Sequence, residues 1–402
     1  MILDIAIIAA VLVSALVLWS PQVHGSTTWQ AMTTPLASII GSGFLVLGPI
    51  LDASYGKYAP LVMLGLCVAA YFYGSALRFN IARIEKTGDR RSPAAEAIET
   101  IASWSLGFAY VISVAYYLNL FGAFAVSLTE VNNPFAAKTV TSAVFAVIVF
   151  VGWSRGFKSL EHLEYVSVTA KLAIIAGLLV GLGHYFGGKA VSGELVFNPP
   201  ELTGWAAITL GFGLIVTVQG FETSRYLGES YDAATRIRSM RWAQWLSAAI
   251  YMAYIVLFAY VFQRGELELN ETAIVDMLGI VAPVLPGLLV AAALSAQFSA
   301  AVADTGGSGG LISELTRDRV SARMAYIALA IIGLVLTWSL NVFEIISYAS
   351  RAFAIYYALQ AGIASVGAWR SGRLPLAIFY GVLALLGAAI ALFGRAVEGG
   401  TA

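Results

Sequence analysis

SIIGSGFLVLGPI, residues 38–50, lies within a stretch that is apolar enough to cross a membrane. Two glycines, Gly41 and Gly43, flank Ser42 near the middle of this stretch. Glycine is among the weakest helix formers, and an interrupted helix is tolerated at bilayer depth only where its freed N–H and C=O groups meet protein or line a cavity. Such glycines can also serve close packing between two helices. The segment therefore predicts either a tight helix contact or a break that lines a site.

The composition of the 402-residue chain places it in a membrane. Hydrophobic residues make up 59% and charged residues 11% of the chain, which is more apolar side chain than a water-soluble core can bury. The net charge is zero, so the sequence does not predict nucleic acid as a partner. The one cysteine, Cys67, excludes an internal disulfide, and His24, His162 and His184 are too scattered for a thiolate or imidazole metal site. We therefore expect no metal site and no cofactor.

Apolar runs of about 20 residues, the length that spans a bilayer, predict about twelve helices. Their expected ranges are 2–20, 29–53, 57–80, 98–128, 139–154, 163–186, 204–227, 238–263, 280–303, 322–339, 342–369 and 373–394. Met1 to Trp19 has no basic region before its apolar run, carries Asp4 and ends at WSPQ instead of a small-residue cleavage site. We therefore expect the first helix to be retained and not removed as a signal peptide.

Lys and Arg are distributed unequally between the two sets of loops. Sixteen of the 23 basic residues lie in or beside the loops after the third, fifth, seventh, ninth and eleventh expected helices. The alternate loops and the C-terminal tail hold only Lys57, Lys138, Lys189, Arg264 and Arg395. Because loops rich in Lys and Arg stay in the cytoplasm, we expect the 29–53 helix to begin there and both termini to lie outside. The expected location is the cytoplasmic (inner) membrane of a bacterium, and the oligomeric state stays open.

A second membrane stretch, LGFGLIVTVQGFETSRYLGES at residues 210–230, is also rich in glycine. It contains Gly211, Gly213 and Gly220 and carries a carboxylate, Glu222, at bilayer depth. Two interrupted helices in corresponding halves of a chain are typical of inverted-repeat transporters with a binding site at the bilayer midplane. The two stretches are five helices apart, so the second enters the membrane from the opposite side, as inversion requires.

Four segments, taken in order, resemble one family. IIGSGFL (39–45) and GFE (220–222) are similar to the breaks in the first and sixth core helices of the amino acid–polyamine–organocation (APC) transporters. SVTAKLAIIAGLL (167–179) resembles their fifth core helix, and ISELTRDRV (312–320) resembles the segment after their eighth. The resemblance covers roughly residues 29–394. It implies an all-α, LeuT-like fold of five plus five inverted helices, and secondary transport, most often of amino acids or amines.

The resemblance also implies a division of the chain. Residues 1–26 would form an additional N-terminal membrane helix, 27–188 the first inverted repeat, 189–370 the second, and 371–402 a C-terminal helix and tail.

The two breaks supply the expected substrate site. Freed N–H groups and a positive helix end attract a carboxylate, freed carbonyls accept from an ammonium, and bare glycines let a ligand approach the backbone. A zwitterion therefore suits the site without a fixed charge, which is costly at bilayer depth. The expected substrate-binding residues are Ser38, Ile40, Gly41, Ser42, Gly43, Thr217, Gln219, Gly220, Phe221 and Glu222.

The sequence departs from the family near the second break. Relatives usually carry aromatic residues just before the sixth-helix glycine, whereas residues 215–219 read IVTVQ. The pocket is then either more open or closed by another ring, such as Phe44, Tyr116 or Tyr117. DTGGSGG, residues 304–310, is likewise not the usual end of the eighth core helix. The identity of the substrate therefore stays open.

Lys171 is the expected coupling residue. Burial penalises the charged form of an amine, and an ammonium here can replace the sodium ion that some relatives hold between their first and eighth core helices. We expect proton coupling through Lys171, with Glu222 as a second proton site or a gate anchor. Alternatives are that Lys171 is a permanently charged structural strut, that Glu222 is bonded to backbone, and that Ser295 and Ser299 bind sodium.

Two further charged residues lie within expected helices. Asp304 is expected at the cytoplasmic interface, and Arg351 in a structural ion pair with a carboxylate of another helix.

Other classes of protein fit less well. A membrane enzyme would need clustered catalytic groups, a scaffold or sensor a sizeable soluble domain or long tails, and a divalent-metal carrier metal ligands at both breaks. We therefore expect a secondary active transporter, not an enzyme, that moves an amino acid or related small amine across the lipid bilayer with protons. Sodium-coupled or exchange transport of another small polar solute, and metal transport, remain the alternatives.

Overall fold

Helices form every regular element in the computed structural model, which describes residues 1–397 apart from 42, 88–92, 155–160, 229 and 265–268. The elements, with η for 3₁₀ turns, are α1 (Ile2–Leu18), α2 (Pro21–His24), α3 (Thr27–Ile39), α4 (Gly43–Tyr55), η1 (Gly56–Tyr58), α5 (Ala59–Thr87), α6 (Pro93–Val126), α7 (Pro134–Ser154), α8 (Glu161–Ser192), α9 (Gly204–Gly213), η3 (Ile215–Val218), η4 (Phe221–Tyr226), α10 (Ala233–Phe258), α11 (Ala273–Val281), α12 (Leu285–Leu315), α13 (Ala322–Ser339), α14 (Val342–Arg370) and α15 (Leu374–Phe393). The all-α expectation is confirmed for this part of the chain.

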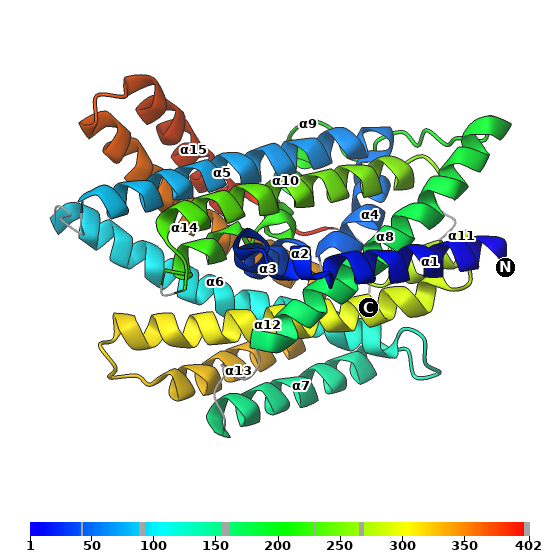
Figure 1. Ribbon diagram of the computed structural model, residues 1–402, viewed down its shortest axis with the longest axis horizontal. Coiled ribbons are helices and arrows are strands. Elements are labelled where there is room, and N and C mark those ends of the chain that lie inside the picture. The colour runs from blue at the N-terminus through cyan, green and yellow to red at the C-terminus, as the bar shows by residue number, and fades with distance from the viewer. Residues whose placement is uncertain (42, 88–92, 155–160, 229, 265–268, 398–402) are drawn as a thin grey trace.

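Most of the long helices run roughly alongside one another, and α8 crosses them obliquely (Figure 1). Eight helical stretches within the described residues are long and apolar enough to cross a membrane, and α1 is a shorter apolar helix. All twelve expected ranges are largely helical, but 29–53 is split into α3 and α4, and 204–227 into α9 and two 3₁₀ turns. A short helix that was not expected, α11, precedes α12.

The centre of the bundle is α6. It contacts α7, α12, α13 and α14, and 89% of the residues in its most apolar window are buried. The helix α1 lies outside this centre, against α8. Its Ile7 is fully buried and fills the space beside Gly177 and Gly181. Several of its other large side chains, such as Leu12 and Leu16, are exposed, as lipid-facing residues are.

The helix α12 is longer than expected. It continues through DTGGSGG to Leu315, whereas the sequence predicted an end near residue 303. Gly307 lies against the ring of Tyr110, and Gly309 against the ring of Tyr326. These glycines therefore let neighbouring helices approach closely and do not end the helix.

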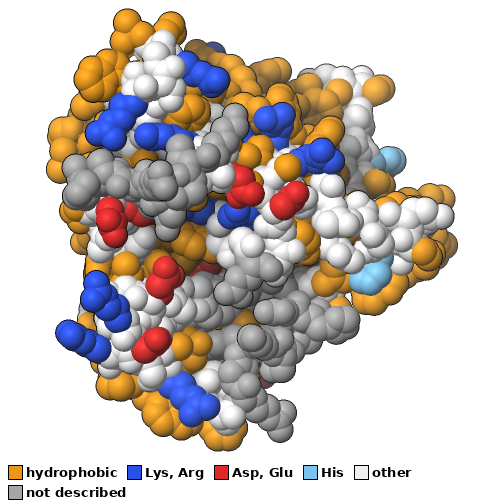
Figure 2. Space-filling view, turned by 60° about the vertical axis from the view of Figure 1, so that its left-hand side comes forward, with side chains coloured by type: hydrophobic (Ala, Val, Ile, Leu, Met, Phe, Trp, Pro, Cys, Tyr) orange, Lys and Arg blue, Asp and Glu red, His pale blue; other side chains and the backbone are white. Residues whose placement is uncertain are grey.

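The connections from α12 to α13 and from α14 to α15 lie at the same end of the molecule, on the left of Figure 1. Figure 2 turns this end forward and shows Lys and Arg side chains spread over it, with Asp and Glu side chains nearer its middle. We call it the basic end.

Candidate substrate site at the two helix breaks

The first break separates α3 from α4. The helix α3 ends at Ile39, Ile40 has a non-helical ψ of 57°, and α4 begins at Gly43. The first N–H groups of α4 have no partner within the helix. The ring of Tyr117 from α6 lies 3.7 Å from where a Cβ on Gly41 would be. Ser42, an expected substrate residue, falls outside the described part of the chain.

The second break is longer than the sequence predicted. The helix α9 ends at Gly213, well before Gly220, and the chain continues as two 3₁₀ turns. Between them Gly220 has a φ of +116°, which L-residues rarely adopt. The glycine is therefore required by the backbone as well as by its surroundings.

The two breaks pack directly against each other. A Cβ on Gly43 would lie 2.7 Å from the Cβ of Thr217, and one on Gly220 would lie 2.6 Å from the backbone nitrogen of Ile39. The expectation that Gly43 leaves its backbone open to a ligand is wrong in this conformation, because Thr217 covers it. The hydroxyl of Thr217 donates to the carbonyl of Leu214 at 2.6 Å and so is held by its own segment.

Two hydroxyl groups satisfy much of the freed backbone. Ser350 of α14 donates to the carbonyl of Gly213 at 2.6 Å and accepts from the N–H of Val216 at 3.1 Å. Tyr251 of α10 lies 2.9 Å from the carbonyl oxygen of Ile39 and 2.6 Å from that of Thr217. One tyrosine therefore links the end of α3 to the end of η3. These partners explain why both breaks are tolerated at bilayer depth.

Lys171 extends from α8 to the first break. Its side chain is 2% exposed, and its Nζ donates to the carbonyl of Ala37, in the last turn of α3, at 2.6 Å. The amine therefore contacts a carbonyl of the first broken helix, which fits both the expected coupling role of Lys171 and the alternative of a structural strut.

Glu222 is the buried carboxylate of the second break. Its Oε2 accepts from the N–H of Gly220 and from the hydroxyl of Tyr357 on α14, each at 2.9 Å. Its Oε1 has no hydrogen-bond partner among the described residues. Beside it, Gln219 donates from Nε2 to the hydroxyl of Tyr117 at 3.1 Å, while its Oε1 also has no partner within the described chain. Two buried acceptor oxygens next to the break therefore have no hydrogen-bond donor among the described residues.

Asp304 is a second intramembrane carboxylate. It is 2% exposed and accepts a hydrogen bond from Ser113 of α6, so the prediction that it is interfacial was wrong. The prediction failed because the sequence indicated a helix end near residue 303, whereas α12 continues to Leu315. Tyr110 and Tyr117, on the same face of α6 as Ser113, lie within electrostatic reach of both Asp304 and Glu222.

Arg351 does not form the expected ion pair within the described residues. Its Nε donates to the carbonyl of Ala391 on α15 at 2.7 Å. The backbone of α15, close to its end, supplies the acceptor that a carboxylate was expected to supply.

The candidate rings separate into two groups. Tyr117 lies over the first break, and Tyr116 packs beside it with centroids 5.2 Å apart. Phe44 instead packs against Tyr254 of α10, with ring centroids 4.5 Å apart and the planes tilted. Phe221 stacks on Tyr357 at 5.2 Å, so its ring faces α14.

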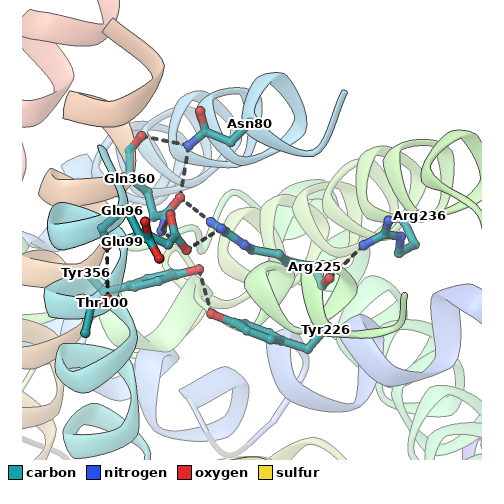
Figure 3. Close-up of polar contacts among 9 residues, drawn as sticks. All are labelled: Asn80, Glu96, Glu99, Thr100, Arg225, Tyr226, Arg236, Tyr356 and Gln360. Atoms are coloured by element: carbon teal, nitrogen blue, oxygen red, sulfur yellow. Dashed lines mark hydrogen bonds and ion pairs between the residues drawn. The ribbon is translucent and has the colours of Figure 1, made fainter. Parts of the chain in front are cut away.

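A polar network surrounds Arg225 and joins η4 to neighbouring helices (Figure 3). Arg225, just after Glu222 in η4, bonds to Glu99 of α6 and to Gln360 of α14. Asn80 of α5 donates to the side-chain and backbone oxygens of Gln360, each at 2.9 Å. We call Asn80, Glu99, Arg225 and Gln360 the basic-end network.

Two further contacts reinforce the network. Arg236 of α10 donates to the carbonyl of Arg225 at 2.8 Å, and the hydroxyls of Tyr226 and Tyr356 lie 3.4 Å apart. Five elements are thereby tied together on this side of the breaks. All the expected substrate residues that the structure describes are buried, so the chain is closed over them.

Several polar residues were missed by the sequence analysis. Tyr251 and Ser350 lie on helices that read as ordinary spans, and only their neighbours reveal their role. Gln297 of α12 is fully buried, and its amide has no partner within the described residues. An amide in the middle of an apolar stretch was a usable signal for Gln297.

Comparison with known proteins is consistent with this geometry. The family described as APC superfamily transporter matches residues 21–394. An uncharacterized protein of Aquifex aeolicus (strain VF5) is 41% identical over 387 residues, which cover 94% of each chain. The substrate-bound outward-open structure of a Na⁺-coupled sialic acid symporter matches with a TM-score of 0.56 and 14% identity, over 99% of each chain. At that identity the match shows the fold, which is LeuT-like with interrupted first and sixth core helices.

Proposed function

Because the chain belongs to the APC superfamily of transporters, we propose that it moves an amino acid or a related small amine across the cytoplasmic membrane, coupled to protons. The observation that carries the proposal is the pair of unpartnered buried acceptors at the second break, Gln219 Oε1 and Glu222 Oε1. Buried acceptors without donors are costly, and a primary ammonium supplies three donors and a positive charge. Binding an amine would satisfy both oxygens.

The rest of the proposed substrate lies toward the first break. The N–H groups at the start of α4, which have no partner within the helix, form a positive helix end, which suits the carboxylate of an amino acid. Tyr117 contacts both sides, because it lies over Gly41 and accepts from Gln219. An amine without a carboxylate would use only the acceptor side, which Glu222 and the nearby Asp304 make acidic.

Proton coupling is proposed through Lys171. While charged, its ammonium holds α3 through the carbonyl of Ala37. Loss of the proton would remove the charge and weaken that bond, so α3 would be freer to move away from α8. Protonation would in this way bias the equilibrium between conformations. Glu222, bonded to both Gly220 and Tyr357, is the proposed second proton site.

The test is uptake of radiolabelled amino acids and amines into proteoliposomes. An inward pH gradient and an inward sodium gradient are imposed separately. We expect accumulation to follow the pH gradient, by up to about tenfold per pH unit for one proton, since one unit corresponds to about 1.4 kcal/mol. Lys171→Ala should abolish this accumulation, and Lys171→Arg should leave the protein locked because guanidinium keeps its proton.

The alternative makes the opposite prediction. Accumulation that follows sodium and ignores the pH gradient would overturn proton coupling and direct attention to Ser295 and Ser299. Uptake of neither amino acids nor amines under either gradient would overturn the proposed substrate class.

A further inference from the structure

Two hollows on the outside of the molecule share the tryptophans of α10. One, of about 640 Å³, is lined by Ala234, Ile237, Arg238, Arg241, Trp242 and Trp245. The other, of about 550 Å³, extends from Trp242 and Trp245 to Trp29 and Met32 of α3. Because they share two residues, they form one groove between the outer face of α10 and the start of α3, which lie against each other (Figure 1). We call it the α10 groove.

The groove carries positive charge that no carboxylate within the described residues neutralises by an ion pair. Arg238 and Arg241 are exposed, and neither forms an ion pair with a described residue. Asp232, six residues before Arg238 and nine before Arg241, is held at the N-terminus of α10, where its carboxylate accepts from the N–H of Thr235 at 2.8 Å; it lies within electrostatic reach of Arg238 without forming an ion pair with it. Their guanidinium groups are therefore available to an anion.

A third guanidinium lies behind the groove. Arg78 of α5 is buried and bonds to Gln244 of α10 and, at 3.3 Å, to the carbonyl of Tyr71. Its charge lies 4.7 Å from the centre of the Tyr71 ring, and this ring packs against Trp245 with centroids 5.5 Å apart. Arg78 lies within electrostatic reach of Arg241. The buried charge of Arg78 therefore lies behind the tryptophan-lined wall of the groove.

The tryptophans indicate how deep in the membrane the groove lies. Trp242 and Trp245 are each 57% exposed. Tryptophan is enriched at the level of lipid headgroups, and α10 enters the membrane from its Arg-rich end. Headgroups therefore lie beside Arg238 and Arg241, and acyl chains beside Trp245 and Met32.

From these observations we infer that the α10 groove binds an anionic phospholipid of the cytoplasmic leaflet. Arg238 and Arg241 contact its phosphate, since a guanidinium pairs with phosphate through two parallel hydrogen bonds. Its acyl chains lie over Trp242, Trp245 and Met32. This ligand supplies both the negative charge and the apolar surface that the groove requires.

The bound lipid would fasten α3 to α10. These two elements already meet at Tyr251, whose hydroxyl contacts the carbonyl of Ile39. The lipid adds a second link, near the start of α3, and so stabilises the closed arrangement. This inference does not depend on the identity of the transported substrate.

The test uses purified full-length protein in phosphatidylcholine, with or without phosphatidylglycerol. Retained lipid is counted by native mass spectrometry, and the unfolding midpoint is measured in parallel. The double variant Arg238→Gln/Arg241→Gln is compared with Arg319→Gln/Arg323→Gln, which removes two exposed arginines far along the chain. We expect wild type and the control to retain at least about tenfold more phosphatidylglycerol than Arg238→Gln/Arg241→Gln. Phosphatidylglycerol should also raise the unfolding midpoint of wild type and the control, but not that of Arg238→Gln/Arg241→Gln.

Further arms separate the possible sources of the anion. Inorganic phosphate alone should not raise the midpoint, and a rise equal to that with phosphatidylglycerol would assign the site to a free anion. Equal retention by the double variant and wild type would overturn the inference. If the protein dimerises when lipid is removed and Trp242→Ala prevents this, the groove binds a second copy of the chain and not a lipid.

Discussion

Single atoms decide how the two breaks meet. Gly43 and Gly220 have no side chain where Thr217 and Ile39 respectively approach, so the interrupted segments touch backbone to backbone. The glycines of the breaks therefore serve both readings of the sequence, because they interrupt the helices and allow close packing.

The hydroxyl of Tyr251 should be essential for this contact. Tyr251→Phe removes the group that lies on the carbonyls of Ile39 and Thr217. Leaving buried acceptors unsatisfied costs about 1–3 kcal/mol, so the unfolding midpoint of the purified protein should fall. The matched control is Tyr348→Phe, because Tyr348 is 46% exposed on α14 and should tolerate the change. Equal midpoints for the two variants would show that the hydroxyl contributes nothing.

Among the elements, η4 connects the candidate site to the basic end. Glu222 at its start belongs to the second break, and Arg225, three residues later, belongs to the basic-end network. If η4 moves to open a path between the candidate site and the basic end, the ion pair between Arg225 and Glu99 must break. The side chains of this pair are only 8% and 15% exposed, so water screens it weakly.

Weakening this pair should open the basic end. In a Cys67→Ala background, Ser224→Cys introduces a thiol at a fully buried position of η4. Adding Glu99→Gln leaves Arg225 without its ion-pair partner, which is strongly destabilising in a buried setting. A membrane-impermeant maleimide applied to inside-out vesicles should then label the thiol several-fold faster.

The control is Glu201→Gln. Glu201 pairs with Arg264 at 3.7 Å but is 66% exposed, so its loss should not change labelling. Unchanged labelling after Glu99→Gln would show that the network does not close the basic end.

At the scale of the whole molecule, the helices are arranged so that the basic connections gather at one end (Figure 2). The N-terminus of α1 lies at the opposite end (Figure 1). The charge bias therefore agrees with a single orientation of the bundle, in which the basic end faces the cytoplasm. The outward-facing end would then hold α11 and the start of α9.

This orientation is tested by two introduced thiols, again in a Cys67→Ala background. Arg319→Cys lies in the α12–α13 connection and Ser192→Cys at the end of α8, and both positions are exposed. In intact cells an impermeant maleimide should label only the Ser192→Cys variant, and in inside-out vesicles only the Arg319→Cys variant. The reverse pattern would invert the whole topology.

Local chemistry in the sequence determined the class of fold. Long apolar runs require helices that span a bilayer, so twelve helical regions were recognisable without any structure. Glycine pairs marked both interruptions, because no other residue is as poor a helix former except proline. Lys171 was identified by the same logic, since a charge at bilayer depth needs a partner.

Only the tertiary structure decided what those groups touch. Asp304 and Arg351 were assigned wrong surroundings, because the end of α12 and the approach of α15 depend on helices distant in the sequence. Tyr251 and Ser350 could not be found from their own segments, since a hydroxyl on an apolar helix has no distinctive local pattern. Helix formation depends on nearby residues, whereas a hydrogen-bond partner across the bundle depends on how all the helices pack. The sequence therefore determined where the chain breaks, and packing decided which side chains satisfy the breaks and which acceptors remain for a ligand.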